Sequence, residues 1–311
     1  MRIHETGKIA SDFYSIGIPA VPVFLLDGPV PVLFDAGFSV LVPLYEQEIK
    51  GILGARSPAY LFLTHSHWDH IGGAGHFKAL WPNLRIAGHS RIREILTHPG
   101  AVQAITRLNR QGTRDMPYWG RTIEKDLPFK SFTLDLDLKA GQLIELAPDC
   151  HVTALHTPGH TWDLMSYWIP ERKILIASEA AGCEIGGRVI SEFLVDYDAY
   201  RRSLLQLIAL EPEILCVAHE MVFTGQDARD YMIQSLEAAE AYVKEVEGIL
   251  RDTAGDVEKT VDRIKTTEWE HLTYPKQPEP AYLINTRARV RHLLERMNKR
   301  EGIGNRERRT P

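Results

Sequence analysis

Residues 61–73, LFLTHSHWDHIGG, constrain the fold of this chain more than any other stretch. A short apolar run ends just before four side chains that can bind a metal: His65, His67, Asp69 and His70. Extended backbone points residues i and i+2 the same way, so His65 and His67 can reach one cation. Asp69 and His70 follow as the chain turns and can face a second cation, or Asp69 can act as a base. The segment therefore predicts a strand that ends in a metal site, with ligand types that suit Zn²⁺, Fe or Mn.

Three further acceptors stand at the ends of other β-like runs. His160 lies in HTPGHTWD (residues 156–163), just after the strand-like run HVTALHT. Glu179 follows the run KILIAS (residues 173–178), and His219 ends the run ILCVAH (residues 214–219). Metal-binding side chains at several strand ends predict that these residues meet in one site.

The motif THSHWDH resembles the His-x-His-x-Asp-His signature of the metallo-β-lactamase superfamily, and TPGHT (residues 157–161) and DAG (residues 35–37) resemble two further motifs of that family. The resemblance spans about residues 10 to 224. It implies an α+β fold, the four-layer αββα sandwich in which two mixed sheets pack face to face with helices outside. It also implies two sets of metal ligands: His65, His67 and His160 on one cation, and Asp69, His70 and His219 on the other, with Glu179 bridging.

The chain departs from the family pattern at Glu179. Most members have Gly-Asp at this position, and this chain has Ser178-Glu179. Glutamate keeps the charge but is longer by one carbon–carbon bond, ~1.5 Å. Three outcomes are open: Glu179 bridges both cations, it binds one of them, or the second cation binds weakly.

Composition limits the class of protein. The 311 residues carry a net charge of −5, which disfavours a nucleic-acid partner that would need a basic face. Three cysteines without a CxxC pair indicate a reducing compartment, and no apolar run approaches the ~18 residues of a membrane helix. We expect a soluble cytoplasmic protein that acts on a small molecule, with a homodimer left open.

Organisation follows from periodicity. Residues 1–224 form the β-rich body, with a helical cap insert at about 90–125 and a Gly-Thr-Arg-Asp break at 112–115. Residues 225–311 form a C-terminal helical extension that caps the site and ends in a frayed charged tail from Arg296. This arrangement is similar to the thioesterase-like branch that holds the bacterial quinolone-signal response protein. Tyr118, Trp119 and Tyr282 are the candidates for an acyl or aromatic pocket.

The resulting hypothesis is a dinuclear metallohydrolase. Two cations would activate a water against an ester, thioester, lactone or phosphodiester, with a thioester or ester preferred. Asp69 would orient the nucleophile and pass a proton to the leaving group. Two alternatives stay open: an iron-dependent redox enzyme similar to persulfide dioxygenases, and a regulatory binding protein with a vestigial metal site.

Overall fold

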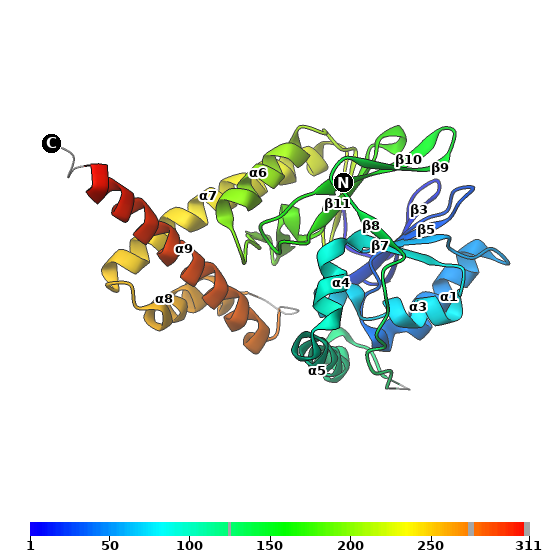
Figure 1. Ribbon diagram of the computed structural model, residues 1–311, viewed down its shortest axis with the longest axis horizontal. Helices are drawn as coiled ribbons and strands as arrows, with labels where there is room; N and C mark the ends of the chain where they lie inside the picture. The colour runs from blue at the N-terminus through cyan, green and yellow to red at the C-terminus, as the bar shows by residue number, and fades with distance from the viewer. Residues whose placement is uncertain (124–125, 273–276, 308–311) are drawn as a thin grey trace.

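The computed structural model describes residues 1–123, 126–272 and 277–307, apart from the side chains of residues 118, 301 and 303–307. Within this range, two seven-stranded sheets pack face to face and helices cover their outer faces (Figure 1). This is the αββα sandwich that the family resemblance implies. None of the helices in the described ranges is both long and apolar enough to cross a membrane.

The first sheet is formed by the N-terminal part of the chain. Its strands pair antiparallel from β2 to β5 and parallel from β5 to β8. In spatial order they are β2 (Gly7–Ala10), β3 (Phe13–Ile18), β4 (Val21–Leu26), β5 (Val32–Phe34), β6 (Tyr60–Phe62), β7 (Arg85–His89) and β8 (Leu136–Leu138).

The second sheet contains the later strands and one N-terminal edge strand. Its pairings are antiparallel except for the parallel pair β12 and β15. In spatial order they are β1 (Arg2–Ile3), β16 (Val222–Thr224), β15 (Ile214–Cys216), β12 (Ile174–Ile176), β11 (Met165–Ile169), β10 (Cys150–His156) and β9 (Gln142–Ala147). A separate hairpin joins β13 (Cys183–Ile185) to β14 (Arg188–Ile190).

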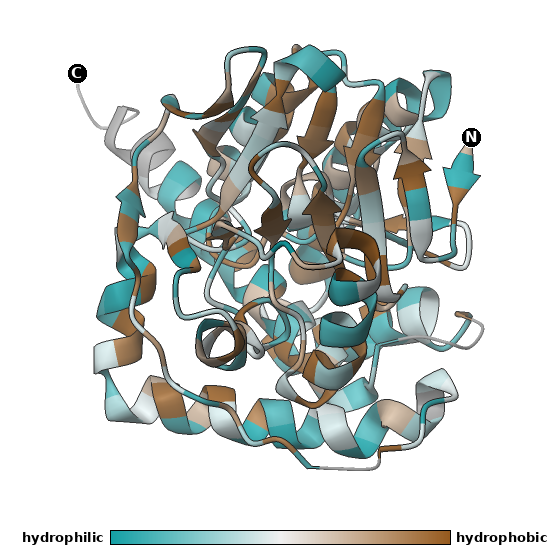
Figure 2. Ribbon diagram, turned by 90° about the vertical axis from the view of Figure 1, so that its right-hand side faces the viewer, coloured by the Kyte–Doolittle hydropathy of each residue, from teal (hydrophilic) through white to brown (hydrophobic). Residues whose placement is uncertain are grey.

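Side-chain alternation builds three apolar layers. In β6, Phe62 faces the core between the sheets, whereas Leu61 faces the helices on the outside. Phe34 and Tyr167 meet in that central core with ring centroids 5.6 Å apart. Figure 2 shows hydrophobic residues gathered on the strands, while the helices alternate between hydrophobic and hydrophilic residues. Each sheet is therefore apolar on both faces, as a covered sandwich requires.

Helices cover the two outer faces in chain order. The first sheet packs against α1 (Val42–Leu53), α3 (Ala74–Leu80), α4 (Ser90–Thr97) and α5 (Pro99–Asp115). The second packs against α6 (Tyr197–Ile208) and α7 (Gln226–Asp252), and α8 (Val257–Ile264) and α9 (Glu279–Glu307) add to this apolar cluster. Short elements complete the set: η1 (Ser39–Leu41), α2 (Trp68–Ile71), η2 (Met116–Trp119), η3 (Pro170–Arg172), η4 (Ser178–Ala181) and the π-helical η5 (Lys265–Trp269).

Two local expectations were wrong. Residues 112–115 do not break the helix, because α5 continues through Asp115. Gly112 serves close packing instead, since a Cβ there would lie 2.7 Å from the Trp68 ring. Where the structure describes the tail expected to fray from Arg296, it is helical as far as Glu307, and residues 308–311 lie outside the described part of the chain. Figure 1 shows α8 and α9 at the end of the molecule opposite α1 and α3.

Candidate metal centre

The THSHWDH segment leaves the sandwich at the end of β6. Thr64 is fixed there because its backbone N–H donates to Asp35 Oδ1 at 2.8 Å. His65 follows with no exposed surface, and His67 keeps an extended conformation just before the one-turn helix α2. That turn carries Asp69 and His70, and the His70 ring lies beside that of His65 with centroids 4.3 Å apart, so one short segment supplies four candidate ligands.

His160 reaches the same edge from the β10–β11 connection. Its neighbour Gly159 has φ +138°, and a Cβ there would lie 2.3 Å from the Tyr200 backbone. The Gly159 carbonyl accepts from the backbone N–H groups of Leu194, Val195 and Asp196. Glycine is therefore required for the tight fit that brings His160 to the site.

Glu179 and His219 arrive from two parallel neighbours, β12 and β15. Glu179 lies in η4 directly after β12 and is 3% exposed. His219 lies in the turn between β15 and β16, held by a hydrogen bond from its Nδ1 to the Ala20 carbonyl at 2.7 Å. All seven residues predicted as ligands thus meet at one edge of the sandwich.

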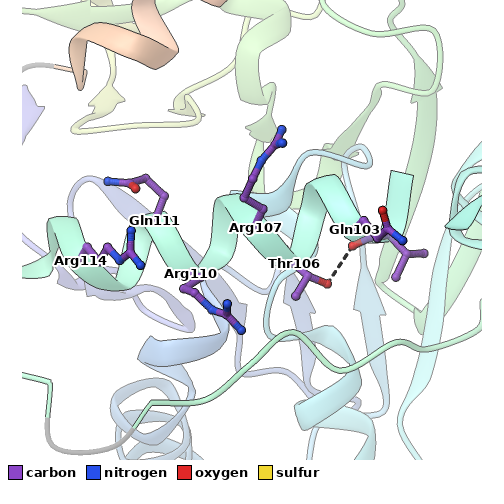
Figure 3. Close-up of a pocket in the computed structure, with 7 residues that line it drawn as sticks. Gln103, Thr106, Arg107, Arg110, Gln111 and Arg114 are labelled. Carbon is purple, nitrogen blue, oxygen red and sulfur yellow. Dashed lines mark hydrogen bonds between the residues drawn. The ribbon is translucent and has the colours of Figure 1, made fainter. Parts of the chain in front are cut away.

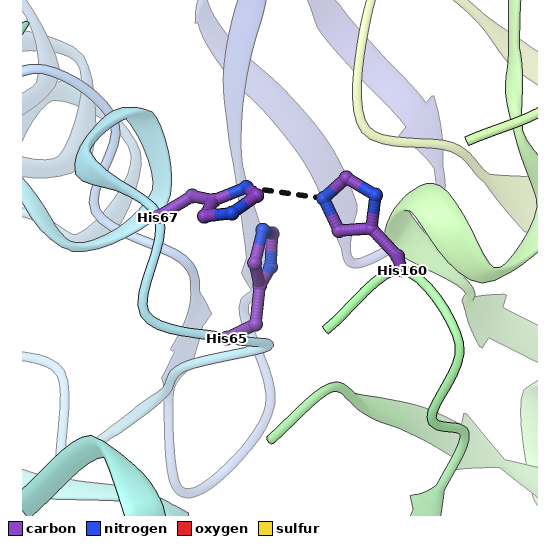
Figure 4. Close-up of side chains that lie close together, drawn as sticks. All are labelled: His65, His67 and His160. Atoms are coloured by element: carbon purple, nitrogen blue, oxygen red, sulfur yellow. Dashed lines mark hydrogen bonds between the residues drawn. The ribbon is translucent and has the colours of Figure 1, made fainter. Parts of the chain in front are cut away.

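Within the described residues these side chains form overlapping groups in which all candidate ligand atoms lie within 4.8 Å of one another. We call His65, His67 and His160 the histidine triad, and Asp69, His70 and His219 the mixed triad. Figure 4 shows the three rings of the histidine triad turned toward a common point. In it, Nε2 of His160 lies 3.0 Å from Nδ1 of His67.

Glu179 lies between the two triads. Its Oε1 is 2.8 Å from Nε2 of His70 and 3.5 Å from Nε2 of His219. Its Oε2 is 3.7 Å from Nδ1 of His65 and accepts a short hydrogen bond from the Ser178 hydroxyl. The same Oε1 is 3.9 Å from Nε2 of His160, so one carboxylate oxygen lies near Nε2 atoms of both triads, while Ser178 holds the other oxygen.

Outer partners fix the tautomers of four histidines. Each of them uses Nδ1 for an outer contact, which leaves Nε2 as the nitrogen that faces the site. The partners are Thr64 Oγ1 for His65 at 3.0 Å, Asp35 Oδ2 for His70 at 2.8 Å, the Glu192 carbonyl for His160 at 2.6 Å and the Ala20 carbonyl for His219 at 2.7 Å.

The two triads differ in their electrostatics. Burial, together with the neighbouring imidazoles, lowers the pKa of His65 and His160 and brings that of His67 to about 4. In the mixed triad, burial also opposes the charged form, but nearby carboxylates outweigh it. Glu179 raises the pKa of His219 to about 9, and Glu179 with Asp35 raises the pKa of His70 well above its usual value.

Glu179 itself is held as a carboxylate. Burial would raise its pKa, but the histidines around it, with His70 first, hold the pKa well below its usual range. A buried anion that histidines surround is an environment that a cation stabilises. The histidine triad offers neutral lone pairs, and the mixed triad with Glu179 offers negative charge.

Orphaned nitrogens support a fit to cations. Among the described side chains, Nε2 of His65 and Nε2 of His70 are buried and have no hydrogen-bond partner. Nε2 of His70 stays without one although Oε1 of Glu179 is 2.8 Å away, so the two atoms are close without the direction of a hydrogen bond. Such neighbouring, unpaired donor atoms are typical of ligands that share an ion.

Of the residues predicted to bind substrate, Trp119 and Tyr282 have described side chains. The Trp119 ring packs against that of Phe38 with centroids 6.0 Å apart. The Phe38 ring in turn stacks on Trp68, the neighbour of Asp69, with centroids 4.7 Å apart. Tyr282 is buried on α9 and donates its hydroxyl to Glu268 at 2.8 Å. The side chain of Tyr118 lies outside the described part of the chain. A role for the three in substrate binding stays a prediction.

Sequence reasoning missed the residues that orient the ligands. The carbonyls of Ala20 and Glu192 hold His219 and His160, and any residue type could supply a carbonyl at these positions. The hydroxyls of Thr64 and Ser178 contact His65 and Glu179. These two could have been found in the sequence, because each is a polar residue at a strand end next to a predicted ligand. Asp35, noted only as part of a motif, binds both Thr64 and His70.

A hollow on the outer side of α5 is separate from this centre (Figure 3). Its lining is Val102, Gln103, Thr106, Arg107, Arg110, Gln111 and Arg114. The opposite side of the helix carries Asn109 and Gly112, which pack against Trp68. The hollow contains none of the candidate ligands, so the three arginines do not belong to the metal centre.

Comparison with known proteins points to the same family as the sequence motifs. A family model described as the metallo-beta-lactamase superfamily matches residues 22–219. The probable metallo-hydrolase YflN of Bacillus subtilis is 25% identical over 266 residues, which cover 73% of this chain and 87% of that protein. A hydroxyacylglutathione hydrolase of Legionella pneumophila is 27% identical over 134 residues, but these cover 42% of this chain and 36% of that enzyme.

Solved structures support the fold. A metallo-beta-lactamase family protein from Thermus thermophilus superposes with a TM-score of 0.64, covering 94% of this chain and 95% of its own. The sequence identity in that superposition is 18%, so this likeness concerns the fold alone.

Proposed function

The chain belongs to the metallo-beta-lactamase superfamily, and we propose that it is a dinuclear metallohydrolase. The observation that carries the proposal is the position of Glu179, whose Oε1 lies 2.8 Å from Nε2 of His70, 3.5 Å from Nε2 of His219 and 3.9 Å from Nε2 of His160, and so approaches both triads. The glutamate side chain, longer than the aspartate of the family pattern, therefore reaches the space between the two triads. Of the three roles open to Glu179, the bridging one accounts best for these distances.

Two cations held by these residues would supply a hydroxide near neutral pH, because they would lower the pKa of a bound water from about 15.7 toward ~7. The protein's own groups hold the reactants. Nε2 atoms of four histidines face the centre because their Nδ1 atoms are bound elsewhere. Asp69 is partly exposed, with Oδ2 3.8 Å from Nε2 of His219, so it can orient the nucleophile and take up its proton.

Zinc or iron fits the donor set, and manganese is the third choice. Imidazole nitrogen and carboxylate oxygen suit all three ions, and among the described residues no thiol belongs to either triad.

A thioester or ester is the proposed substrate class. One relative is named for the hydrolysis of hydroxyacylglutathione, and it matches this chain over 134 residues. The aromatic series Trp119, Phe38 and Trp68 leads toward Asp69 and offers an apolar wall for an acyl group. We place the chain near the thioesterase-like branch that holds the quinolone-signal response protein, with the C-terminal helices as its cap. A small-molecule substrate and a reducing cytoplasmic setting go with this proposal, in line with three unpaired cysteines.

The test is hydrolysis by protein loaded with Zn²⁺ or Fe²⁺. Probes are an S-acylglutathione, an acyl-coenzyme A, a p-nitrophenyl ester and a bis(p-nitrophenyl) phosphodiester, with His67→Ala as the inactive reference. We expect metal-dependent turnover, with the thioester or ester preferred. Iron-dependent oxygen uptake with a thiol substrate would instead establish the redox alternative. Absence of turnover on every probe, with activity restored by Glu179→Asp, would establish the vestigial one.

A further inference from the structure

Two consecutive carbonyls link the histidine triad to the C-terminal helices. The Glu192 carbonyl accepts from Nδ1 of His160 at 2.6 Å. The preceding carbonyl, that of Ser191, accepts from the Arg289 guanidinium on α9 at 3.1 Å. A single peptide unit thus separates a candidate metal ligand from a side chain more than a hundred residues further along the chain.

Arg289 is built into the interior. It is 1% exposed, and its guanidinium donates to Glu268 Oε2 at 2.9 Å and lies over the Tyr242 ring at 4.5 Å. The Tyr282 hydroxyl donates to the same Glu268 oxygen. A buried guanidinium is costly unless it is paired, so the helices keep Arg289 in a defined place.

The segment that Arg289 holds contacts the His160 loop twice. Besides the bond from His160 to the Glu192 carbonyl, residues 194–196 donate their N–H groups to the Gly159 carbonyl. A shift of residues 191–196 would therefore move His160 together with its backbone. On the other side, Arg188 in the preceding hairpin donates to the Thr267 carbonyl at 2.7 Å, which ties the same region to η5.

We propose that Arg289 is a positioning residue that couples docking of the C-terminal helices to cation binding by the histidine triad. It acts through Ser191 and Glu192, whose carbonyl orients the His160 ring. Coupling between two binding events is reciprocal, so a cation in the histidine triad also stabilises the docked α9. The inference rests on the proposed metal centre, but it concerns metal affinity and helix docking and needs no substrate.

The first experiment compares variants of two arginines on α9. Arg289→Met removes the buried donor, and Arg289→Lys keeps a charge. Arg287→Met is the matched control, because Arg287 pairs at 2.9 Å with Glu258 at the surface of the same region. Cation affinities are measured by competition with a chelator. We expect Arg289→Met to weaken the binding of one of the two cations, that of the histidine triad, by about 10–100-fold, as loss of an outer partner does. Arg289→Lys should restore part of this affinity.

The second experiment uses the unaltered protein and so does not depend on any variant folding. Hydrogen exchange is followed in α9 and α1, with Zn²⁺ present and after chelation. We expect Zn²⁺ to slow exchange in α9 and to leave α1 unchanged. Equal weakening of both cations in Arg289→Met, or unchanged affinities together with α9 exchange that ignores Zn²⁺, would overturn the coupling. Normal thioester hydrolysis alongside either result would leave the proposed function intact.

Discussion

The histidine triad and the mixed triad lie at the same edge of the sandwich, yet their chemistry differs. Burial lowers the pKa values of all three residues of the first, so it presents neutral lone pairs. In the second, carboxylates raise the pKa values of His70 and His219, so protons compete with a cation there. Two neighbouring sites in one fold can therefore bind the same ion with different dependence on pH.

The largest effect is expected from removing one ligand of each triad. His160→Ala should lose the cation of the histidine triad and keep the other, and His219→Ala should do the reverse. Hydrolysis should fall in both by more than the roughly 100-fold that loss of an outer partner costs. Metal content and initial rate are measured together. The control is His156→Ala, whose ring stacks 4.8 Å from His89 outside both triads. Loss of both cations in each variant would show that the triads are not separate sites.

The next prediction concerns pH. With a pKa of about 9 for His219 and a raised pKa for His70, each ring must lose a proton to bind a cation, so affinity at the mixed triad should fall with falling pH, by about tenfold per pH unit for each proton displaced. His67, with a pKa of about 4, is already neutral, and affinity at the histidine triad should stay flat from pH 6 to 8. Chelator competition at pH 6, 7 and 8 measures both. Parallel curves for the two cations would contradict the difference.

The same shifts predict the stability of chelated protein. The pKa of His219 is raised on folding, so its contribution is complete below ~6.5 and is lost as pH rises through about 9. The pKa of Glu179 is lowered, so its contribution is present above ~4.5 and is lost as pH falls. Urea unfolding at several pH values should therefore show that His219 and Glu179 together add most to the free energy of unfolding between pH ~4.5 and ~6.5. A rise in stability from pH 7 to 9 would contradict the predicted effect of His219.

A smaller and more local effect is expected at Asp35. Asp35→Asn keeps the shape but removes the charge that faces Nδ1 of His70 at 2.8 Å. Affinity at the mixed triad should fall by about 10–100-fold, and affinity at the histidine triad should fall less, because Asp35 reaches His65 only through Thr64. The matched control is Asp163→Asn, a buried carboxylate in neither triad. An equal loss at both positions would mean that Asp35 supports the whole edge and not one triad.

The smallest effect is on folding. Gly112→Ala places a Cβ against the Trp68 ring, next to the mixed triad, and should destabilise the protein by about 1–3 kcal/mol. Gly100→Ala on the same helix meets nothing within 4 Å and should change stability by no more than about 0.5 kcal/mol. Urea denaturation compares them. Equal stability of the two variants would show that the close packing of α5 against Trp68 does not stabilise this side of the centre.

Much of the centre could be predicted from the sequence because its signals are local. His65 and His67 stand two apart at a strand end, and Glu179 and His219 each follow a short apolar run. The sandwich was expected from the family motifs, and both sheets were found. The predicted break at residues 112–115 failed because a glycine looks like a helix end in sequence, whereas Gly112 makes room for a side chain over forty residues away.

By itself, the sequence determined which side chains can bind cations and where along the chain they lie. The tertiary structure decided which nitrogen of each ring faces the site and which charges surround it. The partners that set this are the carbonyls of Ala20 and Glu192 and the buried Arg289. The physical reason is that every residue has a carbonyl, and a buried arginine resembles a surface one in sequence. Only long-range packing gives these groups their place.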